Sequence, residues 1–85
     1  MGNKKKASAK TDARKSGAIE KKVGGLVRAR RLEIGMSQER LAELLGVTFQ
    51  QVQKYEKGIN RIAFSRMLDI AAALDRPVTA FVPER

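Results

Sequence analysis

The amino-acid sequence predicts an all-α fold, a single small domain of five short helices, on three observations. Apolar residues recur three and four positions apart, which is the spacing of one helix face. Serine, threonine, glycine and proline stand where helices would begin and end. No segment has the pattern of a strand. With 85 residues, the chain can form one domain with a limited hydrophobic core.

The predicted helices span about 23–34, 38–45, 49–57, 64–74 and 78–82. Ser37 and Thr48 are good N-caps for the second and third helices. Glycines at 35, 46 and 58 suit the ends of the first three. Pro77 precedes the fifth helix and Pro83 ends it. Arg31 falls on the buried face of the first helix, so it needs a partner for its charge.

The expected core comes from the apolar faces of these helices. Its members are Val23, Leu26, Val27, Ile34, Leu41, Ala42, Leu45, Val52, Tyr55, Met67, Leu68, Ile70, Ala71 and Leu74. Phe81 lies in the short fifth helix, where little else in the chain is predicted to cover it. We therefore expect a dimer interface formed by Val78, Phe81 and Val82.

The first 22 residues differ from the rest. Residues 1–22 carry eight of the 18 basic side chains and two of the nine acidic ones. They contain too few apolar residues to offset the entropy of ordering, so a disordered basic arm is expected before a domain of residues 23–85. Such an arm would attract phosphates, since neutralising them releases counterions. A plain solubilising tail is the alternative interpretation.

Composition excludes several classes of function. The chain has no cysteine, histidine or tryptophan, so disulfides, zinc sites and most hydrolytic chemistry lack their usual residues. We expect no enzyme activity, metal, cofactor or small-molecule ligand. No apolar run approaches the roughly 20 residues of a membrane span, and a secretory signal is missing. The net charge of +9 favours a polyanionic partner, above all nucleic acid.

The third predicted helix has a polar face that suits the DNA major groove. That face carries Phe49, Gln50, Gln53, Lys54 and Lys57. Glutamine can pair with adenine through two hydrogen bonds, and lysine can donate to guanine O6 and N7. For this helix alone, a merely solvated face is an equal alternative. However, a three-residue turn containing Gly46 joins it to the second helix, and this arrangement is a helix-turn-helix.

Three segments strengthen this interpretation: GMSQERLA at 35–42, LGVT at 45–48 and YEKG at 55–58. Together they closely resemble the lambda repressor-like, Cro/C1-type helix-turn-helix family, also called the XRE family. The resemblance covers about Val23 to Val82. It implies five helices, a DNA-bound dimer and roles for individual residues.

In this resemblance, the base-facing positions are Phe49, Gln50 and Lys54. Phe49 replaces a residue that is usually polar, so a thymine methyl contact or packing replaces a hydrogen bond. Gln38 matches a glutamine that holds a phosphate and braces the recognition helix. Arg31 and Glu56 match a pair that is usually a buried salt bridge. Several residues are expected to contact phosphates because they match family positions, lie on exposed helix faces or cap a helix. They are Arg28, Arg30, Gln38, Thr48, Gln51, Gln53, Lys57, Asn60 and Arg61.

The function expected from all of this is sequence-specific binding of double-stranded DNA by a transcriptional regulator, a repressor in particular. A homodimer would read a pseudo-palindromic operator with half-sites about 34 Å apart. We expect it in the bacterial cytoplasm, on the nucleoid when bound. Two alternatives share the fold: an antitoxin that represses its own operon, and a bridging coactivator. The former usually needs a toxin-binding segment, and a recognition helix rich in glutamine and lysine argues against the latter.

Overall fold

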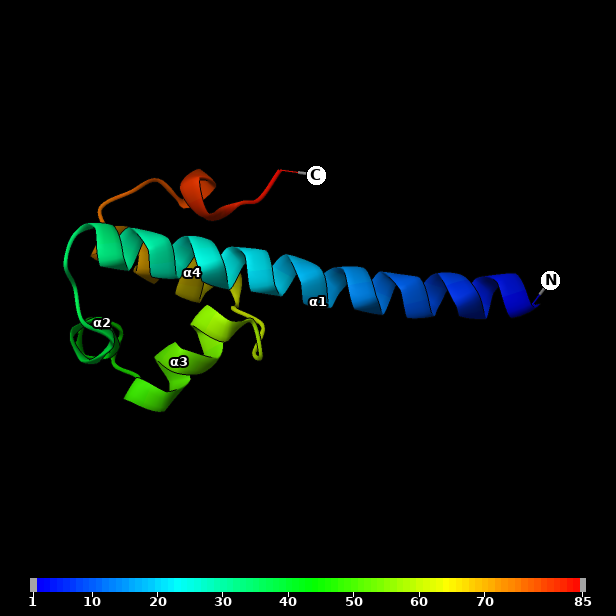
Figure 1. Cartoon of the computed structure of the whole chain (residues 1–85), viewed down its shortest axis with the longest axis horizontal. Helices are drawn as coiled ribbons and strands as arrows, with labels where there is room; N and C mark the ends of the chain where they lie inside the picture. The colour runs from blue at the N-terminus through cyan, green and yellow to red at the C-terminus, as the bar shows by residue number, and fades with distance from the viewer. Residues whose placement is uncertain (1, 85) are drawn as a thin grey trace.

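The computed structural model describes the backbone of residues 2–84 and the side chains of residues 17–84. Residues 2–84 form four α-helices and one 3-10 helix: α1 (Gly2–Glu33), α2 (Gln38–Leu45), α3 (Phe49–Lys57), α4 (Phe64–Ala73) and η1 (Val78–Phe81). Figure 1 shows α1 as a long rod, with α2 and α3 on one side and η1 on the opposite side. None of these helices combines the length and apolar character needed to cross a membrane.

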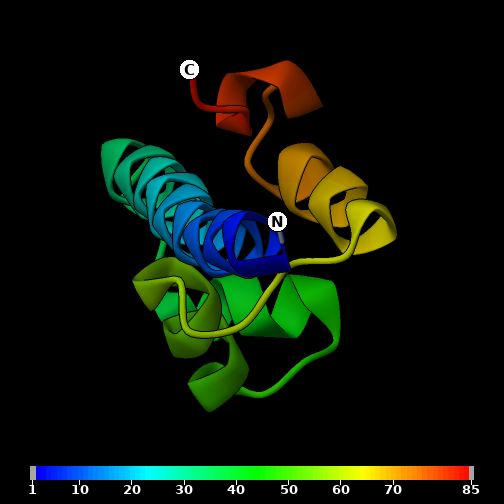
Figure 2. The ribbon, with the colours of Figure 1, turned by 90° about the vertical axis from the view of Figure 1, so that its right-hand side faces the viewer.

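The elements form a closed ring of contacts. Helix α1 packs against α3 and η1, α3 against α2, α2 against α4, and α4 against η1. Figure 2 shows this arrangement viewed roughly along α1. Each element contributes buried apolar side chains to one core: Val27, Leu41, Ala42, Leu45, Val52, Met67, Ile70, Ala71, Leu74 and Phe81. This closure positions α3 against α1 and α2.

The predicted helix caps are confirmed. The Ser37 hydroxyl accepts a hydrogen bond from the Arg40 amide at 3.0 Å, and the Thr48 hydroxyl accepts one from the Gln51 amide at 3.1 Å. Gly46 and Gly58 end α2 and α3 in the left-handed conformation, with φ of 69° and 72°. Each of these glycine amides also donates to carbonyls of the last turn, which satisfies groups that a helix end leaves free.

Two helix boundaries differ from the prediction. Helix α1 begins at Gly2 rather than near Val23, so the expected disorder of the arm is not confirmed. Residues 4–15 are mostly lysine, alanine and arginine, which have high helix propensity, and the packed half of α1 supplies the nucleus that such a segment extends. The predicted fifth α-helix is instead the 3-10 helix η1, four residues long.

Two expected core residues are exposed. Ile34 follows the last residue of α1, where the chain turns toward α2, and it is 39% exposed. Leu68 lies on α4 between the buried Met67 and Ile70 and is 47% exposed. Successive residues on a helix point about 100° apart, so one helix buries only part of its apolar positions in a domain this small.

Candidate nucleic-acid interface

A tight turn joins α2 to α3. The Gly46 and Val47 amides donate to carbonyls of α2 at 3.2 and 3.0 Å, and Thr48 then begins α3. Leu41, Leu45 and Val52 are buried in the core that α2 and α3 share. The turn and this shared core together fix the angle between the two helices. The predicted helix-turn-helix is confirmed.

Helix α3 divides into a buried face and an accessible face. Val52 and Glu56 are buried, and Tyr55 packs against the core while partly exposed. On the accessible face, Gln50, Lys54 and Lys57 are exposed, and the partly exposed members are Phe49, Gln51 and Gln53. The side chains that can form hydrogen bonds with base edges therefore face away from the core.

A buried ion pair braces α3 from α1. Arg31 Nε donates to Glu56 Oε2 at 2.6 Å, and Arg31 Nη2 donates to Glu56 Oε1 at 3.0 Å. Both residues are 6% exposed. Arg31 Nη1 also donates to the Met36 carbonyl at 2.7 Å, which holds the connection between α1 and α2. Two parallel hydrogen bonds of this kind fix the relative orientation of the two side chains as well as the distance between them.

Gln38 completes this network from α2. Its side-chain Nε2 donates to Glu56 Oε1 at 2.9 Å, so the Glu56 carboxylate receives hydrogen bonds from both α1 and α2. The Gln38 amide nitrogen carries two hydrogens, and one of them remains available for another acceptor. Within residues 17–84, no buried side-chain nitrogen or oxygen lacks a hydrogen-bond partner.

Close backbone contact also sets the position of α3. A Cβ added at Gly24 of α1 would lie 2.3 Å from the Tyr55 carbonyl oxygen and 2.6 Å from that of Glu56. At the end of α3, a Cβ at Gly58 would lie 2.5 Å from the Lys21 Cα. Only glycine at these two positions lets α1 approach α3 this closely.

The loop after α3 contacts α1 through an ion pair at the surface of the protein. Arg61 Nε donates to a Glu20 carboxylate oxygen at 3.1 Å, while the Arg61 side chain remains 76% exposed. Asn60 is partly exposed in the same loop, and Lys57 is exposed in the last turn of α3. Lys57 is part of the accessible face of α3, and Asn60 and Arg61 follow it in the loop, whereas Arg28 is exposed on α1.

Arg30 does not belong with the expected phosphate contacts. Its Nε donates to the Leu74 carbonyl at the end of α4 at 2.8 Å, and its Nη1 pairs with Glu33 at 2.9 Å. Only 14% of its side chain is exposed. The expectation was wrong because helical spacing places Arg30 beside the buried face of α1, where the end of α4 needs a hydrogen-bond donor.

The expected dimer contact of Phe81 is also wrong. Phe81 is 2% exposed and packs in the core of its own chain, so it cannot offer an apolar surface to a partner. Val78 is partly buried against the same core, and only Val82 is largely exposed, at 62%. Contacts of η1 with both α1 and α4 cover the Phe81 ring, which was expected to lack cover.

Several functional details were not predicted. The Arg30 bond to Leu74 and the Arg61 pair with Glu20 join positions far apart in sequence. Gln38 was expected to brace the recognition helix, but its partner Glu56 was not identified. The Gly24-Gly25 pair within a helix was the one available signal of a close helix contact.

Comparison with known proteins agrees with this geometry. A family model described as helix-turn-helix matches residues 27–81. An uncharacterized HTH-type transcriptional regulator of Sinorhizobium medicae is 52% identical over 68 residues, which cover 80% of this chain and 49% of the relative. The chain thus spans about half the length of that relative.

Solved structures show the same fold. The restriction-modification controller protein C.AhdI from Aeromonas hydrophila is 33% identical, with a TM-score of 0.72 over 75% of this chain and 97% of the controller. Hydroxypropylphosphonic acid epoxidase from S. wedmorenis also matches, at 27% identity and a TM-score of 0.72. That match covers 76% of this chain but 35% of the epoxidase, so the fold also occurs as one part of a larger enzyme.

Proposed function

The chain belongs to the Cro/C1-type helix-turn-helix family, and we propose that it binds double-stranded DNA and regulates transcription. The observation that carries this proposal is the contrast between the two faces of α3. One face is fixed by a buried ion pair and the core, and the other presents exposed glutamine and lysine. The related regulators and the controller protein support the same function.

In the proposed complex, α3 enters the major groove. Gln50 and Lys54 contact bases, and Phe49 contacts a thymine methyl or packs against α2. Phosphate contacts come from Arg28, Gln38, Thr48, Gln51, Gln53, Lys57, Asn60 and Arg61. Gln38 lies at the start of α2, where helix amides favour an anion, and its second amide hydrogen can reach a phosphate. The chain would act by binding rather than by catalysis.

Repression follows from such binding in simple steric terms. A domain seated in the major groove of a promoter excludes other proteins from the same surface. Two copies related by a two-fold axis would read two half-sites of a pseudo-palindromic operator. We therefore propose a homodimeric repressor that works in the bacterial cytoplasm, on nucleoid DNA.

The surface proposed for the dimer differs from the one expected from sequence. Val82, Phe64 and Ile19 are 62%, 69% and 50% exposed, and they border an apolar groove of about 290 Å³. Phe81 lines the inner part of this groove without being exposed. Val82, Phe64 and Ile19 form the apolar rim of the groove. Burial of this rim against a second copy of the chain would supply the driving force for association.

We expect Lys54→Ala to weaken binding to the preferred duplex by about 1–3 kcal/mol and to relax preference at one base pair. The reason is that the exposed lysine donates to a base edge rather than only to phosphate. Fluorescence anisotropy with the preferred duplex and its single-base variants measures both effects.

Lys22→Ala is the matched control, because it removes the same charge from an exposed position on α1. It should leave the base preference unchanged. If Lys54→Ala keeps the wild-type preference at every position, then Lys54 is not a base-reading residue.

We expect Val82→Asp and Phe64→Asp each to shift the protein toward monomer, because each places a charge in the apolar rim. Sedimentation equilibrium without DNA measures the shift, and circular dichroism confirms that the helices remain. Ile59→Asp is the control, since Ile59 is 66% exposed but does not line the groove. Equal dimer dissociation constants for all four proteins would place the interface elsewhere.

A further inference from the structure

A second pocket lies on the side of α1 that faces away from α3. It has a volume of about 320 Å³ and is lined by Leu26, Ala29, Arg30, Glu33, Arg76, Ala80 and Phe81. Figure 1 places η1 and the C-terminal segment on the opposite side of α1 from α3. A molecule in this pocket would thus leave the accessible face of α3 free.

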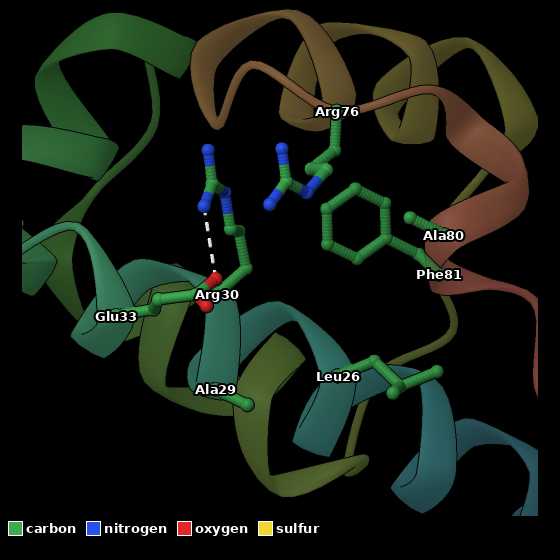
Figure 3. A pocket seen from close by; sticks show the side chains of 7 residues that line it. All are labelled: Leu26, Ala29, Arg30, Glu33, Arg76, Ala80 and Phe81. Atoms are coloured by element: carbon green, nitrogen blue, oxygen red, sulfur yellow. Dashed lines mark hydrogen bonds and ion pairs between the residues drawn. The ribbon is translucent and has the colours of Figure 1, made fainter.

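Two arginines meet in this pocket. Figure 3 shows the guanidinium groups of Arg30 and Arg76 turned toward the same space, beside the ring of Phe81. Arg30 is held in place by its bond to the Leu74 carbonyl and by Glu33. Among residues 17–84, no acidic side chain forms an ion pair with Arg76. The pocket therefore has two positive charges and one negative charge in its lining.

Glu33 is the one acidic group in the lining of the pocket. Arg30 Nη1 donates to a Glu33 carboxylate oxygen at 2.9 Å, and the Glu33 side chain is otherwise 63% exposed. This hydrogen bond and the charge of Arg30 lower the pKa of the Glu33 carboxyl, with a smaller contribution from Arg76. A guanidinium has five N–H donors, so both arginines keep donors for a further acceptor.

The other lining residues are apolar. Leu26, Ala29, Ala80 and Phe81 form the apolar wall of the pocket, and Figure 3 shows the Phe81 ring beside the Arg76 guanidinium. The volume is near the lower end of the range for small-molecule sites, about 300–1,000 Å³. The lining residues have a net charge of +1, which one negative charge neutralises. The pocket therefore favours a monoanion over a dianion such as phosphate. The apolar wall favours a ligand that has an aromatic or branched body.

We propose that this pocket is a binding site for a small organic monocarboxylate with an apolar body. The carboxylate would lie between Arg30 and Arg76, and the body would lie against Leu26 and Ala80, which are accessible in the pocket lining. This inference goes beyond DNA binding and does not depend on it, because the site and α3 occupy different sides of α1.

Phenylacetate is a suitable probe, with 2-phenylethanol as the neutral analogue and inorganic phosphate as the anion without an apolar body. Each is titrated into the ¹⁵N-labelled full chain, followed by amide chemical shifts. We expect saturable shifts at Ala29, Arg30, Ala80 and Phe81 with phenylacetate, and at least about tenfold weaker binding of the other two compounds.

Three variants test the charge assignment. Arg76→Gln should weaken phenylacetate binding about tenfold or more, because it removes a charged donor. Glu33→Gln should strengthen binding, because it removes the competing carboxylate. Arg40→Gln removes an exposed charge on α2 that does not line the pocket, and it should change nothing. The same spectra show whether each variant is folded.

Three outcomes would overturn the proposal. The first is the absence of saturable shifts in the pocket residues. The second is equal affinity for phenylacetate and 2-phenylethanol, or for phenylacetate and phosphate. The third is unchanged phenylacetate affinity in folded Arg76→Gln.

Discussion

Arg31→Ala is expected to lower the free energy of unfolding by about 3–5 kcal/mol. The substitution leaves the Glu56 carboxylate buried and charged, with only Gln38 as a side-chain donor. The Met36 carbonyl loses a donor as well. Since native domains are stable by roughly 5–15 kcal/mol, this loss is a large fraction of the total stability. Urea denaturation followed by circular dichroism measures the change.

Arg40→Ala supplies the matched control. Arg40 pairs with Glu43 on the surface of α2, where both side chains are more than half exposed. An exposed pair of this kind contributes about 0–1 kcal/mol. The double substitution Arg31→Met with Glu56→Leu should recover much of the stability, because it leaves no unpaired buried charge. Similar losses in Arg31→Ala and Arg40→Ala would show that the buried pair has no special role.

Gly24→Ala is expected to destabilise the domain by about 3 kcal/mol, the upper end of typical overpacking costs. The added methyl would lie 2.3 Å from a backbone carbonyl of α3, so α1 and α3 must separate. Backbone cannot move aside as the end of a flexible side chain can. The separation would also lengthen the bonds between Arg31 and Glu56. Thermal and urea denaturation measure the loss.

Gly25→Ala is a nearly ideal control, one residue further along the same helix. A Cβ at Gly25 has no neighbour within 4 Å. This variant should be more stable than the wild type by about 0.5–1 kcal/mol, because alanine favours the helix interior. If both alanine variants are stabilised, α1 and α3 do not pack through Gly24.

The sequence predicted local structure well and long-range contacts unevenly. Thr48 and Gly58 mark the ends of α3 because capping depends on residues only a few positions apart. Arg31 at a buried position implied a partner, but its identity as Glu56 came from the family resemblance. Helical spacing alone cannot tell which neighbouring element faces a given side chain.

The errors have the same cause. Phe81 was correctly expected to need cover, but its own chain provides that cover rather than a second copy. Arg30 lies on a helix with many exposed basic residues, and nothing local reveals that the end of α4 lies beside it. Gly24 lies inside the first helix, and nothing local reveals that it admits the backbone of α3. In each of these cases the missing information was a tertiary contact between distant segments.

The proposed base contacts at Gln50 and Lys54 lie at the centre of this account. Selection of bound sequences from random duplex DNA, at two salt concentrations, tests them most directly. The wild type should enrich two-fold related half-sites centred about 34 Å apart at both concentrations. The double variant Gln50→Ala with Lys54→Ala should lose this enrichment and still bind DNA at low salt through phosphate contacts. No enrichment by the wild type, or the same enriched sequence from both proteins, would contradict the account.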